Sequence, residues 1–491
     1  MSVTSPSSPA TRDLPRATVI ATFVISGVAA FMSSLDNLVV TMALPSIRQH
    51  LGTSLESLQW TVNAYTLVFA VLLLPAATLG DRFGRRKVFT IGLAIFTAAS
   101  AIAALAPNIE TLIAARALQG VGGAVILPLS LTVLSAAVPP ERRGAALGVW
   151  GATSGLAVAL GPLIGGAVTQ GASWQWIFWL NVPIGVALLP LAWRGLAETY
   201  GPKQRLDVSG LVLVAAGLLG VVLGVIRGND AGWTSLEVVT SLLVGVGLLI
   251  AFVVRESRTD APMLPLRLFR SRAFSMTNLA SLLFSAGMFG AIFLLAQYLQ
   301  IVQGYGPLSA GIRTLPWTGM PLLIAPIAGP LSDRIGGRPL LVTGLTLQAG
   351  GLFWLYDVLS PGVSYGEIVP AFVMCGIGMS LFFVPVANVV LGSVRPQEEG
   401  VASGANNAIR EVGGVFGVAA LGAIFSAQGG YASVDSFSDG IHPAILVGAI
   451  VVAVGALASA FIPRHRRSPD AVAVDDHLGV EHAPGLATAE A

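Results

Sequence analysis

Leu79-Gly-Asp-Arg-Phe-Gly-Arg-Arg-Lys87 is the stretch that decides the fold, because most of it occurs a second time. Leu331-Ser-Asp-Arg-Ile-Gly-Gly-Arg-Pro339 repeats its Leu, Asp, first Arg, second Gly and last Arg, and 252 residues separate the two aspartates. A second pair of glycine-rich stretches, starting at Gly144 and Gly400, repeats at a separation of 256 residues. Two similar separations indicate that the chain is an internal duplication.

Long apolar runs lie on both sides of each of these two repeated stretches. The chain has 491 residues, of which 54% are hydrophobic and only 11% are charged, a balance far too apolar for a soluble globular protein. A helix needs about 20 mostly apolar residues to cross a bilayer. Runs of this kind predict fourteen transmembrane helices, at residues 18–43, 59–80, 87–106, 110–136, 143–168, 176–193, 208–226, 236–254, 275–302, 309–331, 339–359, 367–392, 400–427 and 441–462.

The repeat divides these helices into two sets. It relates helices one to six to helices nine to fourteen, which predicts a six-helix bundle at 18–193 and another at 275–462. Residues 194–274 are then a linker with two additional transmembrane helices, and the tails 1–17 and 463–491 are predicted to be disordered. The fold class is an all-α polytopic membrane protein, and parallel repeats around a shared pathway are typical of rocking-bundle transporters.

The distribution of charge predicts the orientation in the membrane. Arg and Lys cluster in the loops that follow even-numbered helices, which places these loops and both termini in the cytoplasm. The net charge of +2 gives no basic surface for nucleic acid. The single Cys375 lies in an apolar run and is expected to pack rather than react.

Sequence signatures of catalysis are absent. The sequence has no phosphate-binding loop, metal-ligand cluster or nucleophile motif, so we expect no cofactor, no metal and no enzymatic activity. Only two Lys stand against 25 Arg, with abundant Ala and Gly, which favours a GC-rich bacterial genome and therefore a location in the cell membrane.

The loop after the second helix resembles the G-x-L-x-D-R-x-G-R-R/K signature of the major facilitator superfamily, with Ala77 in place of the first Gly. Gly84 permits a tight turn, and Asp81 is placed to pair with an Arg and to cap a neighbouring helix. We expect a latch that holds the inward gate shut, although a cationic loop that only sets orientation is the alternative. Its residues are Asp81, Arg82, Gly84, Arg85 and Arg86, with Asp333 and Arg334 in the second copy.

The fifth helix resembles the antiporter motif of exporters in this superfamily, G-x-x-x-G-P-x-x-G-G, with Ala157 at the first Gly. The matching residues are Gly161, Pro162, Gly165 and Gly166. Gly161 and Gly165 form a small face that another helix can approach, and Pro162 bends the helix. The resemblance favours export over uptake. Non-specific packing of small residues is the alternative.

The first helix carries Leu35-Asp-Asn-Leu-Val-Val-Thr-Met-Ala-Leu-Pro45, which resembles the signature of the fourteen-span drug:proton antiporters, with Leu38 and Thr41 as departures. A carboxylate within a span must pair, face the interior or bind a proton, so Asp36 is a candidate for coupling. Arg116 in the fourth helix resembles the R-x-x-Q-G-x-G motif, which the family associates with proton coupling. The alternative for Asp36 is a carboxylate at the outer end of the helix that is simply hydrated by solvent. The alternative for Arg116 is a structural salt bridge to a neighbouring helix.

The thirteenth helix matches the same family at Asn407 and Arg410, with Glu411 beside them. Asn407 and Arg410 share a helix face, whereas Glu411 points about 100° away, so Arg410 and Glu411 need not pair. Glu411 is a second candidate for the pathway, with a hydrated position as the alternative. Trp174-Gln-Trp-Ile-Phe-Trp-Leu-Asn-Val-Pro-Ile-Gly185 closely resembles another marker of the family, whose aromatic residues we expect to anchor at the interface.

These resemblances imply a proton-coupled antiporter that exports lipophilic or cationic drugs. The expected partners are a small amphipathic or cationic compound, protons and the lipid bilayer, and we expect a monomer. An exporter of a dedicated metabolite, such as a self-made antibiotic, an amino acid or a siderophore, is the alternative. A membrane receptor is a third possibility, but it requires a soluble signalling module that the sequence lacks.

Overall fold

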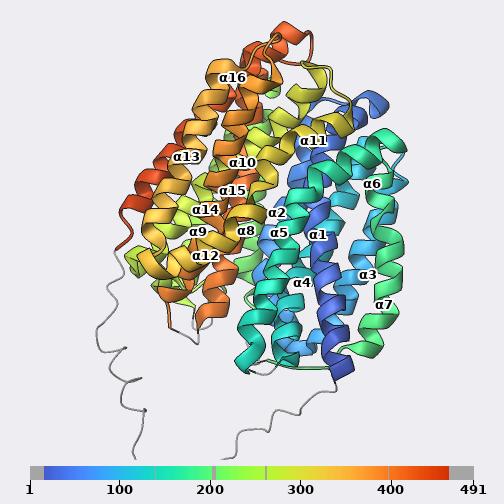
Figure 1. The fold of residues 1–491 in the computed structure, drawn as a ribbon, viewed down its shortest axis with the longest axis vertical. Coiled ribbons are helices and arrows are strands. Elements are labelled where there is room, and N and C mark those ends of the chain that lie inside the picture. The colour runs from blue at the N-terminus through green and yellow to red at the C-terminus, as the bar shows by residue number, and fades with distance from the viewer. Residues whose placement is uncertain (1–15, 139, 202–205, 260–261, 396–397, 464–491) are drawn as a thin grey trace, which may run out of the picture.

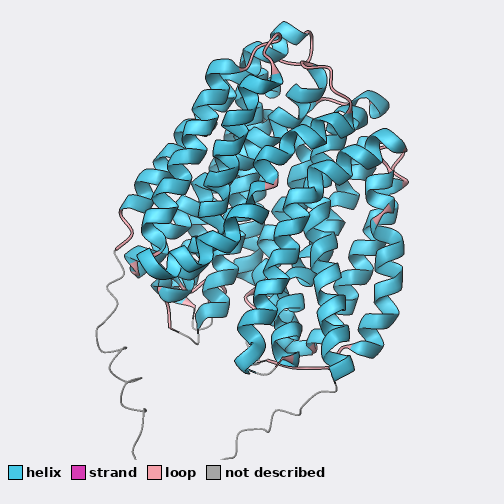
Figure 2. Ribbon diagram, viewed as in Figure 1, coloured by secondary structure: helices cyan, strands magenta, loops and turns pink. Residues whose placement is uncertain are grey.

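The structure is a computed structural model that describes residues 16–138, 140–201, 206–259, 262–395 and 398–463, and within these ranges the regular elements are all helices (Figure 2). The N-terminal bundle comprises α1 (Arg16–Leu51), α2 (Leu55–Phe83), α3 (Arg85–Ala104), α4 (Ile109–Ala137), α5 (Pro140–Gly171), α6 (Trp176–Trp179) and α7 (Asn181–Gly195). The inserted helices are α8 (Val208–Ala231) and α9 (Leu236–Arg258), followed by the short 3-10 helix η1 (Leu266–Arg270). The C-terminal bundle comprises α10 (Arg272–Ile301), α11 (Pro307–Thr318), α12 (Met320–Ile335), α13 (Gly337–Val358), α14 (Tyr365–Gly392), α15 (Glu399–Gln428) and α16 (Val434–Ala460).

The fourteen predicted spans are all present as helices. Thirteen helical segments of the described chain are long and apolar enough to cross a membrane, and α6 with α7 counts as one of them. The remaining predicted span, 309–331, is divided into α11 and α12 at Gly319. Pro316 and Pro321 flank this break and cannot donate backbone hydrogen bonds, which explains the interruption. The predicted fold class is confirmed, whereas the predicted tails lie outside the described residues except for positions 16, 17 and 463.

The two bundles repeat the same helix pairings. In the N-terminal bundle α5 packs on α1 and α4 packs on α2 and α3; in the C-terminal bundle α15 packs on α10 and α14 packs on α12 and α13. Glycine allows the closest of these contacts. A Cβ atom on Gly165 of α5 would lie 2.6 Å from the Val39 carbonyl oxygen of α1, and one on Gly417 of α15 would lie 2.0 Å from the Ala286 carbonyl oxygen of α10. Both distances are below van der Waals contact, so these helices meet backbone to backbone.

The bundles lie side by side and meet along two seams, α5 with α11 and α2 with α15 (Figure 1). Helix α8 covers the second seam, where its Val222 is buried among Leu67 of α2 and Val415 of α15. The start of α1 and the end of α16 lie at the same end of the molecule (Figure 1). We call this the inner end and the opposite one, which carries residues 52–54 and 172–175, the outer end.

Candidate functional site

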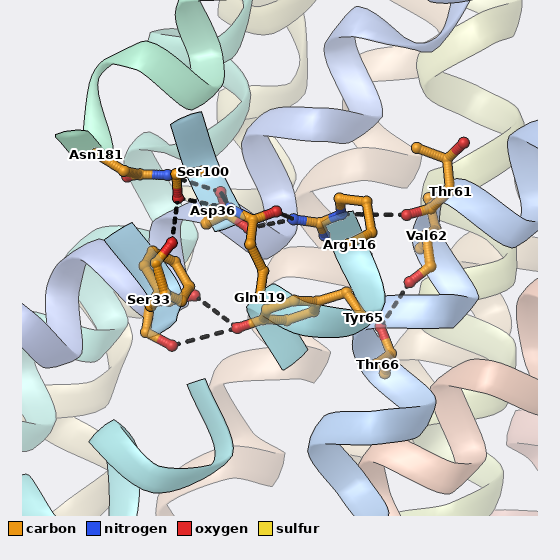
Figure 3. A network of polar contacts seen from close by, with 11 residues as sticks. Ser33, Asp36, Thr61, Val62, Tyr65, Thr66, Ser100, Arg116, Gln119 and Asn181 are labelled. Carbon is orange, nitrogen blue, oxygen red and sulfur yellow. Dashed lines mark hydrogen bonds and ion pairs between the residues drawn. The ribbon is translucent and has the colours of Figure 1, made fainter. Parts of the chain in front are cut away.

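Asp36 lies inside the N-terminal bundle and is 3% exposed (Figure 3). Its Oδ2 forms an ion pair with Nη1 of Arg116, which is 0% exposed. Its Oδ1 accepts hydrogen bonds from Asn181 Nδ2 at 2.8 Å and from Gln119 Nε2 at 3.2 Å. Three helices, α1, α4 and α7, therefore converge on one carboxylate. Two of the residues predicted from separate motifs, Asp36 and Arg116, are brought into direct contact.

The Arg116 guanidinium is enclosed on all sides. Its Nε donates to the Thr61 carbonyl oxygen at 3.1 Å, and Nη1 also donates to Gln119 Oε1 at 2.9 Å. The Tyr65 ring covers one face, with 4.4 Å between the guanidinium carbon and the ring centroid. Nη2 is buried without a hydrogen-bond partner. A permanent cation in this place requires the Asp36 carboxylate as its counter-charge, because an unpaired buried charge is strongly unfavourable.

Three polar residues of this network were not predicted as site residues. Asn181 belongs to the aromatic marker motif, and it reaches Asp36 because α7 begins at this residue, directly after the break at Leu180. Gln119 connects Arg116, Asp36 and Ser100, whose Oγ lies 2.8 Å from Gln119 Nε2. The only available signal was the position of Asn181 and Gln119 within family motifs.

The predicted residues of the C-terminal bundle lie on α15 and are not part of this network. Glu411 is half-buried, and its Oε2 is buried without a hydrogen-bond partner. Arg410 places its guanidinium 4.9 Å from the centroid of the Phe383 ring, and no ion pair joins it to Glu411 within the described ranges. Asn407 is half-buried, whereas its neighbour Asn406 is buried and donates to Asn278 Oδ1 of α10 at 3.1 Å.

The predicted latch is built around Asp81 at the inner end of α2. Asp81 forms an ion pair with Arg85 at 2.8 Å, whereas the exposed Arg82 lies over the Phe83 ring. The first turn of α3 is capped by Glu198, not by Asp81: Glu198 Oε1 accepts from the backbone N–H of Arg86 at 2.9 Å. Glu198 was missed in the sequence, because it lies beyond α7, 112 positions from its partner.

Two glycines make this arrangement possible. Gly84 has a φ of 104°, and a Cβ atom there would lie 2.8 Å from the Glu198 carboxylate. Gly201 donates its backbone N–H to the Asp81 carbonyl oxygen at 3.1 Å. Residues 198–201 are therefore held against the motif loop.

The second copy of the motif is arranged differently. Asp333 and Arg334 are exposed at the end of α12, and neither has an ion-pair partner in the described part of the chain. Gly336 repeats the turn with a φ of 84°. The duplicated backbone turn is retained without the charged contacts of the first copy.

The antiporter motif lies where α5 meets two other helices. Gly161 and Gly165 face Leu38 and Val39 of α1, just after Asp36. A Cβ atom on Gly166 would lie 2.3 Å from the Pro307 carbonyl oxygen of α11, in the other bundle. Pro162 lies within α5, and its carbonyl oxygen lies 2.3 Å from the Cβ position of Gly311 in α11. This motif therefore joins the Asp36 helix to the seam between the bundles.

Two repeated bundles of membrane-length helices, one of which encloses a buried ion pair, form an architecture that is typical of secondary transporters. Residues 26–418 and 314–482 match the sequence profile of the Major Facilitator Superfamily, and the chain belongs to this family.

Several relatives are exporters by name. The chain is 33% identical over 426 residues to the tetracenomycin C resistance and export protein of Streptomyces glaucescens, covering 86% of this chain and 79% of that protein. It is 40% identical over 414 residues to the cephamycin export protein CmcT of Amycolatopsis lactamdurans, covering 82% and 84%. A solved POT family transporter in complex with a thioalcohol-conjugated peptide shares the fold, with a TM-score of 0.69 and 15% identity over 92% of this chain and 100% of that one.

Proposed function

We propose that this protein is a proton-coupled antiporter that exports lipophilic or cationic organic compounds across the cell membrane. The observation that carries the proposal is the buried Asp36–Arg116 pair, which places a protonatable carboxylate and a fixed cation at the centre of one bundle. The names of the relatives, two of them export proteins, support the outward direction. The contact of Gly166 with α11 supports a role of the antiporter motif in the motion between bundles.

Protonation of Asp36 links the proton flux to the substrate flux through the packing of α1. Protonation of Asp36 removes the counter-charge of Arg116, and the guanidinium must then find other partners among the carbonyl and amide oxygens around it. That change within α1 and α4 biases the packing of α1 against α5 and hence the seam with α11. Glu411, with one unpartnered carboxylate oxygen in the other bundle, is the acceptor for a cationic substrate.

A second candidate function is export of one dedicated metabolite. It is favoured by relatives that are named for single antibiotics, tetracenomycin C and cephamycin. A substrate panel separates the two functions, because a multidrug exporter transports unrelated lipophilic cations and a dedicated exporter transports one chemical family.

The orientation and the oligomeric state belong to the same proposal. Arg82, Arg85, Arg86 and Lys87 lie at the inner end, together with the start of α1 and the end of α16, which supports cytoplasmic termini. Each chain contains both bundles and the whole Asp36 network, so a monomer is sufficient for transport.

The test is transport of ethidium in proteoliposomes with an imposed pH gradient. Asp36→Asn is expected to abolish pH-driven transport, because the side chain no longer binds and releases a proton. Glu411→Gln is expected to reduce transport of cationic compounds and to spare neutral ones. Undiminished pH-driven transport by Asp36→Asn would contradict the assignment of Asp36.

A further inference from the structure

A shallow pocket of about 470 Å³, lined mostly by polar residues, opens at the outer end of the N-terminal bundle, between α1, the end of α5 and the start of α6. Ser46, His50, Thr169 and Trp174 are among its lining residues. Thr169 is 8% exposed, and its hydroxyl has no hydrogen-bond partner although it lines the pocket. His50 Nδ1 accepts a hydrogen bond from Trp174 Nε1 at 2.7 Å. No part of the proposed transport cycle uses this pocket.

A narrow gap lies between the same helices and the start of α7, and Asp36 and Asn181 are among its lining residues. It has no space for a water molecule. Apart from those two residues its lining is apolar, and we call four of these apolar residues the plug: Val39, Ile164, Val168 and Ile177.

The pocket and the gap are aligned along the same three helices. On α5, Val168 lines the gap and the next residue, Thr169, lines the pocket. On α1, Val39 and Ser46 are seven residues apart, which corresponds to about 10 Å along a helix. The plug residues therefore line a gap that also reaches Asp36, and the pocket adjoins this gap on its outer side, at Val168 and Thr169 of α5.

We propose that this column is the route by which protons reach Asp36 from the outer surface, separate from the substrate pathway between the bundles. The inference rests on the proposed role of Asp36. An apolar constriction of this width excludes water and conducts only when it becomes hydrated, so the plug acts as a gate for protons. Because Gly161 and Gly165 of α5 pack on α1 beside the plug, a shift between these two helices changes its width.

The surroundings of Asp36 are compatible with this role. The charged or titratable groups that face it are Arg116 from α4 and Tyr65 from α2. The other contacts, Gln119 and Asn181, are neutral amides. The outer route approaches the carboxylate from the side of Asn181, away from Arg116 and Tyr65, so a proton arriving there does not have to pass the guanidinium.

The first test fills the gap. Val168→Phe is expected to lower pH-driven ethidium transport about tenfold, because the plug can no longer hydrate, while counterflow of ethidium at equal pH stays within about twofold of the parent. Val186→Phe is the matched control, since Val186 is 57% exposed on α7 and does not line the gap. Equal pH-driven transport by the two variants would overturn the proposed route.

The second test widens the gap and does not depend on accommodating a larger side chain. Val168→Ala is expected to raise the proton flux into substrate-free proteoliposomes several-fold, and adding Asp36→Asn to it is expected to remove the increase. A flux equal to that of Val186→Ala would overturn the route. The two proposals fail separately: if Asp36→Asn alone abolishes coupling while the Val168 variants match their controls, the role of Asp36 stands and only the route is wrong.

Discussion

Arg116 and Asp36 pair within one bundle and not across the seam, because α4 and α1 both belong to the N-terminal repeat. The pair can therefore break and form while the two bundles stay in contact elsewhere. Tyr65 and Gln119 enclose it from α2 and α4, so the change is confined to a few side chains. Coupling to transport then depends on how α1 packs against α5.

The energetics of this pair can be measured through stability. Arg116→Ala is expected to cost about 3–5 kcal/mol, because it leaves the Asp36 carboxylate buried without a counter-charge. The double variant Asp36→Asn with Arg116→Gln is expected to recover most of that loss, since both charges are gone, and yet to remain inactive. Thermal unfolding in detergent and the ethidium assay measure the two effects. A double variant as unstable as Arg116→Ala would show that the loss does not come from the unpaired charge.

The latch can be tested by comparing its charged residues. Asp81→Asn and Glu198→Ala are both expected to reduce transport strongly while membrane insertion is preserved. Asp81→Asn removes the ion pair with Arg85, and Glu198→Ala removes the cap of α3, which is worth about 0.5–2 kcal/mol.

The same series contains its own controls. Arg85→Ala is expected to be more harmful than Arg82→Ala, because Arg85 is the partner of Asp81 and Arg82 is exposed. Asp333→Asn is expected to have little effect, since Asp333 is exposed without an ion-pair partner in the described ranges. Equal losses at Asp81 and Asp333 would argue against a latch in the first copy alone.

Local sequence patterns predicted the spans and the two buried charges of the N-terminal bundle, but not the break within one span or the contact between the charges. Apolar runs of bilayer length predicted the spans, because the requirement for lipid-facing residues is local. The division of the span 309–331 at Gly319 was missed, since hydropathy does not register the prolines that interrupt the helix. Asp36 and Arg116 were each predicted as site residues because a charged side chain within a membrane span is energetically unfavourable. Their contact was not predicted, because it depends on the packing of α1 on α4.

The roles of Glu198 and Asn181 could not be predicted from the residues next to them in the sequence. Glu198 reads as an ordinary charged residue in a loop, and its function as a cap arises only because residues 198–201 lie against the start of α3. Asn181 lies among aromatic residues that fit an interfacial anchor, and the break before α7 directs it to Asp36 instead. Both roles depend on contacts between segments that are far apart in the sequence.

The ion pair between Asp207, just before α8, and Arg255 of α9 predicts that the stability of the protein depends on pH. Burial raises the pKa of Asp207, which precedes α8, but hydrogen bonds from Arg255 and from the Gly210 backbone N–H outweigh it, so the pKa lies below its usual value. A lowered pKa stabilises the fold above the unfolded value of about 3.9, and this contribution is lost as the pH falls through the lowered pKa.

The thermal midpoint measured between about pH 7 and pH 3 tests this prediction, because that range includes the unfolded value. Asp207→Asn keeps a capping side chain but cannot titrate, so its midpoint is expected to fall less steeply with acid than that of the parent. Asp357→Asn, at an exposed position near the end of α13, is the matched control and is expected to follow the parent. Parallel curves for Asp207→Asn and the parent would exclude the effect.

Asn229 gives the inserted helices a testable role at the outer end. Its Nδ2 donates to the Ala423 carbonyl oxygen and, at 2.7 Å, to Ser426 Oγ, both on α15, while its Oδ1 accepts from Trp233 Nε1 at 2.9 Å. Since α8 also packs on α2, these hydrogen bonds hold α8 in place over the seam between α2 and α15.

Asn229→Ala is expected to lower the free energy of unfolding by about 1–3 kcal/mol, because acceptors on α15 lose their donor. It is also expected to open the seam more often. Ala419 is 0% exposed there, so an Ala419→Cys reporter in a Cys375→Ala background measures the opening through its rate of reaction with a membrane-impermeant maleimide. Thr240→Val is the control, since Thr240 is exposed on α9 and bonds only to its own helix. If the reporter reacts equally fast in both variants, α8 fills the seam without holding it closed.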